Sequence, residues 1–274
     1  MKNVICKLAL LTAFIGFSAF AQNSQTPINV TTTTPNSSLP QFTQWSNVST
    51  GLNFTMQNFI GAMFCTDNAC VNAVDSRWGT LKLLPNSPAP QIQFGGTTYT
   101  LLEFHFHTPS EHWVNNNVTD MEVHFVFFKN SDAPVFCNSN SLLVLGQRIV
   151  ASGSDNPQWT KIFSSGVTLP INYAATSVSV TQFNIGGAIG VSPNSGSYRY
   201  SGGLTAPANL GCSATGNAGN QLATGVLPEV VSWVLLKQPL YLSAAQVAKF
   251  KTLFPGGNAR DVQPVNSRTV YSTP

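Results

Sequence analysis

Short runs of β-type residues, broken by Gly, Pro and Asn, follow one another along the chain from Gln41 onward. Apolar and polar positions alternate within several of these runs, which is the pattern of strands with one buried face. The Gly95-Gly96 pair separates two such runs and predicts a hairpin. The predicted strands cover residues 79–84, 91–94, 98–107, 121–129, 142–150, 198–202 and 230–236.

One segment, residues 244–253, has the pattern of a helix. Ser243 is its predicted N-cap and Pro255-Gly256-Gly257 its stop. The sequence therefore predicts a mainly β fold with a few short helices. No internal repeat and no polar linker interrupts the chain after Gln41, so residues 41–274 are expected to form one domain.

The first residues have the features of a secretory signal peptide. Lys2 and Lys7 precede and flank an apolar stretch that is too short to span a bilayer, and Ala19-Phe20-Ala21 forms a small-x-small cleavage site. We expect residues 1–21 to be removed and the protein to be exported, either to a periplasm or outside the cell; an uncleaved anchor is the alternative. Residues 22–40, rich in Thr, Asn, Ser and Pro, are predicted to be a disordered lead-in.

Composition narrows the possible partners. Charged residues make up 8% of the chain, the formal net charge is +3, and no Lys/Arg cluster follows the signal. A nucleic-acid surface is therefore not supported, and no later apolar run is long enough to cross a membrane. The oligomeric state is not determined by these features. The cysteines after the signal allow three pairings, and at least one disulfide is expected in an oxidising compartment, with free buried thiols as the alternative; they are Cys65, Cys70, Cys137 and Cys212.

All four histidines of the chain lie within residues 103–124. Side chains alternate faces along a strand, so His105 and His107 point to one face while Phe104 and Phe106 point to the other. An antiparallel returning strand can place His124 beside them. Three neutral imidazoles with a fourth position open are the ligand set of a catalytic zinc. Ordinary polar side chains on an exposed strand are the alternative, and it explains three such residues on one face poorly.

The sequence around these histidines resembles the α-class carbonic anhydrases. The motif FHFHTPSEH (residues 104–112) followed by MEVHFV (121–126) is highly specific to that family. Matches continue in order with LLVLG (142–146), YRYSGGLTAP (198–207), EVVSWVLL (229–236) and NARDVQPVNSR (258–268), so that the resemblance covers residues 79–271. It implies a large, mostly antiparallel sheet with one zinc ion at the base of a conical cleft.

The resemblance also implies an activity and assigns roles to residues. The expected reaction is the reversible hydration of carbon dioxide to bicarbonate by zinc-bound hydroxide. Thr205 matches the threonine that accepts a hydrogen bond from this hydroxide, and Glu111 matches the glutamate that takes the threonine's proton. Glu122 matches the glutamate that orients the third zinc histidine. The zinc ligands correspond to His105, His107 and His124, and the apolar wall for carbon dioxide to Val126, Val144, Leu204 and Trp233.

Several positions depart from the family pattern. Gly79 stands where the family usually has a proton-shuttling histidine, and His112 belongs to the motif, so slowed proton transfer is expected. Glu103 replaces the usual glutamine beside His105, and Ala206 replaces a common second threonine. Residues 208–228 form a small, polar insertion expected near the cleft mouth, and the family's amino-terminal signature is not recognisable before Gly79.

Two other functions remain open. A binding or adhesion protein that keeps the fold but has lost useful catalysis is favoured by Gly79, by Lys82 at the rim and by the rebuilt amino-terminal part; the intact histidines oppose it. A zinc esterase is the other, expected as a side activity. The resemblance further implies a disulfide from Cys212 to Cys65 or Cys70, with Cys137 free to take the remaining one.

Overall fold

Three long neighbouring strands form the centre of the sheet. The computed structural model describes residues 25–59, 79–133, 140–170, 178–205 and 231–274. β7 (Thr97–His107), β9 (Met121–Lys129) and β10 (Leu142–Ala151) pair antiparallel in that order, and β10 then pairs in parallel with β13 (Val231–Leu236). These segments are rich in Phe, Val and Leu, which favour strands because they pack well on a pleated surface.

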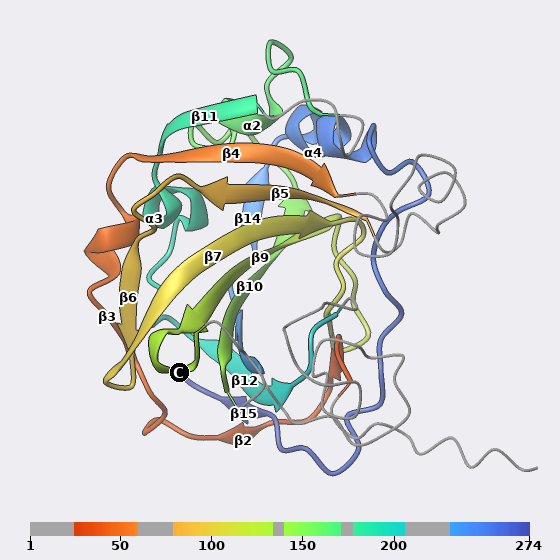
Figure 1. Ribbon diagram of the computed structural model, residues 1–274. Helices are drawn as coiled ribbons and strands as arrows, with labels where there is room; N and C mark the ends of the chain where they lie inside the picture. The colour runs from red at the N-terminus through yellow and green to blue at the C-terminus, as the bar shows by residue number, and fades with distance from the viewer. Residues whose placement is uncertain (1–24, 60–78, 134–139, 171–177, 206–230) are drawn as a thin grey trace, which may run out of the picture.

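The sheet continues on both sides of these strands into one 13-stranded, mixed sheet. Figure 1 shows it curving from β11 and β4 at the top to β15 and β2 at the bottom. A separate two-stranded sheet joins β1 to β8. The other strands are β1 (Asn29–Val30), β2 (Thr34–Pro35), β3 (Phe42–Thr43), β4 (Leu52–Phe59), β5 (Thr80–Pro85), β6 (Gln91–Phe94), β8 (Trp113–Val114), β11 (Val178–Phe183), β12 (Ser197–Gly202), β14 (Leu240–Leu242) and β15 (Tyr271–Ser272).

The described helices are short. They are α2 (Thr160–Phe163), α3 (Ile185–Ile189) and α4 (Ala244–Lys251), with 3₁₀ turns η1 (Trp45–Val48) and η3 (Asn130–Asp132). The predicted helix is α4, and Ser243 caps it as expected: its side chain accepts from the Gln246 amide, and the Gln246 side chain bonds back to the Ser243 amide. This capping box satisfies two of the amides that a helix start leaves unpaired.

The mainly β fold and all seven predicted strands are confirmed, with ends shifted by one residue at most. The sequence analysis did not predict the longer strands β4 and β11, or the strands of two or three residues, β1, β2, β3, β8, β14 and β15. In β4, Phe54 and Met56 are buried and alternate with polar residues, so the period-two signal is present there too. β11 is shorter, buries Val180 and Phe183, and has an irregular register against β4.

The two faces of the sheet carry two different apolar clusters. The alternate residues Phe104 and Phe106 of β7 belong to the larger cluster, together with Trp159, beside α2, and Phe250 of α4. Figure 1 shows α2 and α4 lying together near the β4 end of the sheet. The opposite face holds a smaller cluster that includes Val126, Val144 and Trp233. The histidines alternate with the phenylalanines and therefore lie on this second face.

The described part of the amino-terminal segment contradicts the prediction of a disordered lead-in over residues 22–40. In residues 25–40, Ile28 and Val30 are buried in the smaller cluster, β1 pairs with β8, and β2 pairs with β15. Polar composition misled the prediction because two short backbone pairings and two buried side chains are enough to fix this segment against the sheet.

Other predictions fall outside the described residues. They concern the signal peptide at 1–21, the insertion at 208–228, and all four cysteines proposed for disulfides, Cys65, Cys70, Cys137 and Cys212. Among the described residues, no helix is long and apolar enough to cross a membrane.

Candidate metal centre

Strand register brings the three predicted ligands together. His105 of β7 lies directly opposite His124 of β9, and His107 is two residues further along β7 on the same face. The ring centroids are 5.0 Å apart for His105 and His107, 5.2 Å for His105 and His124, and 4.9 Å for His107 and His124. One nitrogen from each ring lies within 4.8 Å of the others, so the three side chains can hold one metal ion.

Each ring also has one nitrogen held by the protein. His105 Nδ1 lies 2.9 Å from both carboxylate oxygens of Glu103, and His124 Nε2 lies 2.8 Å from Glu122 Oε1. His107 Nδ1 lies 3.2 Å from the carbonyl oxygen of Asn258. These acceptors require the facing nitrogens to carry the protons, which fixes the tautomers of the neutral rings.

On each ring, the nitrogen that is not held by these acceptors carries a lone pair. Nε2 of His107 and Nδ1 of His124 are buried and have no hydrogen-bond partner among the described residues. A buried polar atom without a partner is costly, and a metal bond removes that cost. Together with His105 Nε2 they form a three-nitrogen donor set, which suits Zn²⁺ with a fourth position left for a small molecule. The residues present therefore fit a catalytic zinc.

Burial decides the charge of two of the rings. It lowers the pKa of His105, and it holds the pKa of His107 well below the usual value, with the neighbouring histidines adding to the effect. Burial also opposes charge on His124, but the carboxylate and hydrogen bond of Glu122 raise the pKa of that ring above its usual value. Burial therefore favours the neutral, metal-binding form of His105 and His107, whereas Glu122 favours the protonated form of His124, so that metal competes with a proton at that ring.

Glu122 is fixed from two sides. Its Oε2 accepts from the His112 amide at 2.8 Å, and its Oε1 lies 2.6 Å from His112 Nδ1 as well as 2.8 Å from His124. The second nitrogen of His112 lies 2.6 Å from the hydroxyl of Tyr200. Burial alone raises the pKa of Glu122, but the contacts with His112 and His124 hold it well below the usual value. His112 is therefore a buried link that positions Glu122.

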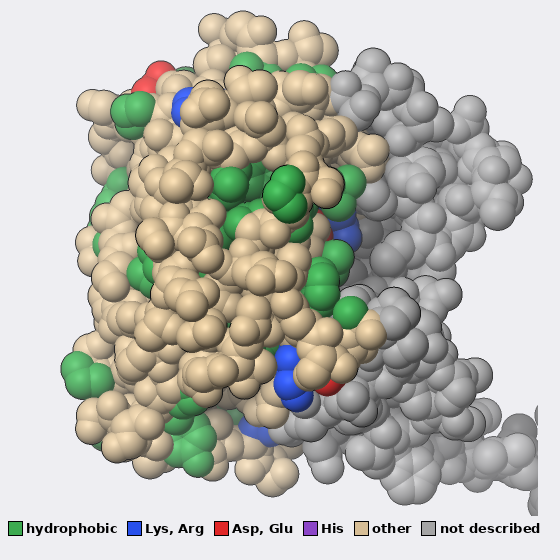
Figure 2. Space-filling view, turned by 60° about the vertical axis from the view of Figure 1, so that its left-hand side comes forward, with side chains coloured by type: hydrophobic (Ala, Val, Ile, Leu, Met, Phe, Trp, Pro, Cys, Tyr) green, Lys and Arg blue, Asp and Glu red, His purple; other side chains and the backbone are tan. Residues whose placement is uncertain are grey.

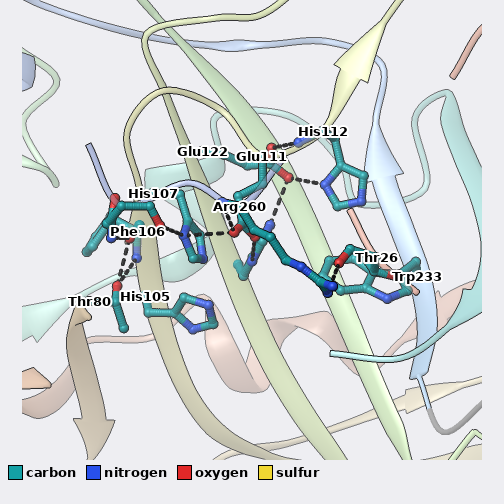
Figure 3. Close-up of polar contacts among 12 residues, drawn as sticks. Thr26, Thr80, His105, Phe106, His107, Glu111, His112, Glu122, Trp233 and Arg260 are labelled. Carbon is teal, nitrogen blue, oxygen red and sulfur yellow. Dashed lines mark hydrogen bonds and ion pairs between the residues drawn. The ribbon is translucent and has the colours of Figure 1, made fainter. Parts of the chain in front are cut away.

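Glu111 lies between His107 and Arg260 (Figure 3). Its Oε1 accepts from the Arg260 amide at 3.0 Å and lies 3.3 Å from His107 Nδ1. Its Oε2 is buried with no hydrogen-bond partner in the described chain, although the Thr205 hydroxyl is near enough to lower the pKa of the carboxyl group. Burial is the dominant effect and raises the pKa of Glu111 to about 7.

Glu103 brings a further negative charge to the centre. It is 5% exposed, and Lys82 Nζ lies 4.0 Å from its Oε1. Burial raises the pKa of Glu103, but the contact with His105 and the charge of Lys82 outweigh burial and lower it. Lys82 lies opposite His105 in the pairing of β5 with β7, so the strand register places the cation beside the acid.

The residues of the expected apolar wall also come together. Val126, Val144 and Trp233 are buried in the smaller cluster, and Leu204 packs against it. The Trp233 ring lies 5.0 Å from the His124 ring, so this wall borders the histidines. Its indole nitrogen donates to the Gly203 carbonyl at 3.0 Å, which ties the wall to the segment leading to Thr205.

The centre also uses residues to which the sequence analysis gave no role. The Asn258 side chain donates to the carbonyls of Gly79 and Phe106, each at 2.9 Å, while its backbone holds His107. Asn258 and Arg260 lie in the motif NARDVQPVNSR, and Tyr200 lies in YRYSGGLTAP. The motifs identified these residues, but only tertiary contacts show which atoms they hold.

Charged side chains are sparse elsewhere. On the face drawn in Figure 2, Lys, Arg, Asp and Glu are few and scattered among uncharged polar groups, and no histidine is visible. This agrees with a chain in which charged residues make up 8%.

Comparisons with known proteins give a consistent result. A family model for eukaryotic-type carbonic anhydrases matches residues 15–213. A carbonic anhydrase of Klebsiella pneumoniae is 30% identical over 68% of this chain, and one of Nostoc sp. is 32% identical over 67%. These matches span 63% and 57% of the two relatives, which is less than two thirds of their length.

A solved structure shares the fold. The α-carbonic anhydrase from Thermovibrio ammonificans, in complex with the inhibitor sulfanilamide, superposes with a TM-score of 0.63 at 24% sequence identity. The alignment covers 91% of this chain and 87% of that one. At this identity the similarity establishes the fold and not the activity.

Proposed function

The chain belongs to the eukaryotic-type carbonic anhydrase family, and from that premise we propose that it catalyses the reversible hydration of carbon dioxide to bicarbonate and a proton. The proposal includes one zinc ion held by His105, His107 and His124. The observation that carries it is the convergence of three imidazole nitrogens, two of them buried without another partner.

Zinc, when bound, supplies a Lewis acid that brings the pKa of water from that of the bulk liquid to about 7. The chain supplies orientation. Glu111 has one oxygen committed to the Arg260 amide and the other vacant. When ionised, it can accept a hydrogen bond from the Thr205 hydroxyl at the vacant oxygen. The Thr205 oxygen is then left as an acceptor, so it directs the lone pair of the attacking oxygen toward the substrate.

The apolar wall provides the site for the substrate. Carbon dioxide is small and carries no net charge, so it is better placed against Val126, Val144, Leu204 and Trp233 than against charged groups. Because the Trp233 ring lies 5.0 Å from the His124 ring, a molecule on this wall lies beside the centre. Such proximity supplies part of the rate enhancement by holding the reactants in an attack geometry.

Stopped-flow measurement of carbon dioxide hydration by the zinc-loaded mature chain tests the proposal. His105→Ala, His107→Ala and His124→Ala are each expected to lose most of the metal and to abolish hydration, because each removes one of three protein bonds of about 2.0–2.1 Å to zinc. Lys249→Ala, on α4, is the control and is expected to keep both. A single histidine variant with stoichiometric zinc and full turnover would refute the ligand assignment.

The same measurement separates the alternatives. A wild-type chain that binds one zinc ion but does not hydrate carbon dioxide would instead be a binding protein with the family fold. Ester hydrolysis without carbon dioxide hydration would point to a zinc esterase.

A further inference from the structure

Arg199, on β12, is a buried cation without a counter-charge. It is 5% exposed, its Nε donates to Ser197 Oγ at 2.9 Å, and its Nη1 donates to the Pro40 carbonyl. Its Nη2 is buried and has no hydrogen-bond partner in the described chain, nor does any described carboxylate form an ion pair with it. Burying an unpaired charge is costly, so such a group normally has a partner.

The Arg199 group keeps its charge at neutral pH. Burial lowers the pKa of the guanidinium to about 10, which is still well above 7. Phe94 lies against it, with the guanidinium carbon 5.3 Å from the ring centroid. A ring face offers a weak attraction to a cation, but it accepts no hydrogen bond from the vacant Nη2.

Arg199 lines a cavity of about 450 Å³ between the β12–β13–β15 end of the sheet and the segment before β3. This size falls within the range of small-molecule sites. The lining combines a second arginine, Arg268, with aromatic and hydroxyl side chains such as Phe94, Tyr271 and Ser201. It contains no Asp or Glu among its described residues, and none of the three zinc histidines, Glu111 or Thr205.

We propose that this cavity binds a small organic carboxylate, with its anionic group on Arg199 Nη2 and its apolar body against Phe94 and Tyr271. Nη2 is the nitrogen of Arg199 that has no partner, and a carboxylate oxygen can accept a charge-assisted hydrogen bond from it. Arg268 adds a second positive charge to the lining. The volume and the aromatic walls exceed what a bare carboxylate such as acetate needs. Tyr200 and Trp233, which border the histidine centre, also line this cavity, but the proposed ligand contacts are made by other residues and the proposal does not depend on the proposed function.

The strand pairing shows where a carboxylate introduced by mutation would occupy the proposed ligand site. Ser201 follows Arg199 by two residues on β12, so both side chains project from the same face. Ser201 pairs with Ser232 of β13, and both line the cavity. A carboxylate introduced by Ser201→Asp would stand in for the ligand, and this variant leaves the contacts of Arg199 with Ser197 and Pro40 in place.

Calorimetric titration of the zinc-loaded chain with benzoate tests the proposal, with benzamide as the uncharged analogue and acetate as the carboxylate without a body. Benzoate is expected to bind wild type more tightly than either. Arg199→Gln and Ser201→Asp should each weaken benzoate binding about tenfold or more, the scale of one hydrogen bond to a charged group. Lys249→Gln removes a charge outside the cavity and should change nothing.

The comparison between variants isolates the cavity, because any carboxylate bound at the histidine centre would be common to all of them. Equal benzoate affinity in wild type, Arg199→Gln and Ser201→Asp would overturn the proposal, as would benzamide binding as tightly as benzoate. Acetate binding as tightly as benzoate would refute the role of the aromatic walls. If Arg199→Gln does not fold, Ser201→Asp decides the result.

Discussion

At the residue scale, the centre depends on three acidic side chains that differ in how their oxygens are bound. Glu122 is bound by His112 and His124, and Glu103 by His105. Glu111 differs, since one of its oxygens is held by the Arg260 amide and the other is vacant. These three acids therefore serve different purposes: two fix the rings and one is available to a hydroxyl.

Thr205 and Glu111 are expected to act as one unit. Thr205→Ala or Glu111→Ala should each lower kcat/KM for carbon dioxide about 10²-fold, the scale of losing one orienting contact. The double variant should be little worse than the worse single one, because both remove the same alignment. Thr205→Ser keeps the hydroxyl and is expected to retain most activity. Losses that multiply fully in the double-mutant cycle would contradict the relay.

Glu103 should raise the kinetic pKa of hydration. Because its own pKa is lowered by the contact with His105 and the charge of Lys82 despite burial, it is ionised at neutral pH. A fixed negative charge favours the protonated, more positive state of the centre. Glu103→Gln should therefore lower the kinetic pKa of kcat/KM, by less than about one unit because Lys82 offsets part of the charge.

A variant that removes the neighbouring cation is expected to shift the kinetic pKa in the opposite direction. Lys82→Met leaves Glu103 without its cation and should raise the kinetic pKa. A pH–rate profile that is unchanged in both variants would show that this carboxylate does not influence the centre.

At the element scale, the close spacing of strands β9 and β10 limits the size of the side chains that can lie beside the histidine centre. Gly146 of β10 lies directly opposite His124 of β9. A Cβ at Gly146 would lie 3.2 Å from Glu122 Oε1, 3.2 Å from Leu235 Cδ1 and 3.6 Å from His124 Cδ2. Such contacts are tight, and the hydrogen bonds of Glu122 leave it little freedom to move.

Gly146→Ala is therefore expected to weaken zinc binding, about tenfold if Glu122 is displaced from His124. Competition with a chelator measures the affinity. Gly166→Ala is the matched control, since a Cβ there meets nothing within 4 Å. Unchanged zinc affinity in Gly146→Ala would mean that the two strands can separate at no cost to the centre.

At the scale of the whole molecule, the open question is how a proton leaves the centre. All four histidines are engaged: three face the metal position, and His112 bridges Glu122 and Tyr200. Gly79 is buried and its carbonyl accepts from Asn258, so no side chain there carries protons. An efficient relay needs a group with a pKa near the working pH. Proton transfer through water and buffer is therefore expected to limit turnover.

The prediction is a kcat that rises with the concentration of imidazole-type buffer while kcat/KM stays constant. Gly79→His should raise kcat at low buffer, whereas Gly256→His, which adds an imidazole in open space beyond α4, should not. High wild-type turnover that does not respond to buffer would mean that another group carries the proton.

The sequence by itself determined seven of the strands, the α4 cap and the grouping of three histidines, because these depend on local periodicity and short spacings. His105 and His107 must share a face of any strand, and the motif supplied His124. The sequence did not show that residues 25–40 have a defined structure, because that structure depends on pairing with β8 and β15 far along the chain.

Only the tertiary structure decided which nitrogen of each ring is left for a metal. That choice rests on partners such as Asn258, 151 residues from His107. It likewise decided that Arg199 is buried beside a cavity without an acid, because its neighbours come from segments before β3, in β6 and after α4. Burial and long-range contacts set the charge and hydrogen bonding of a side chain, and neither can be read from its neighbours along the chain.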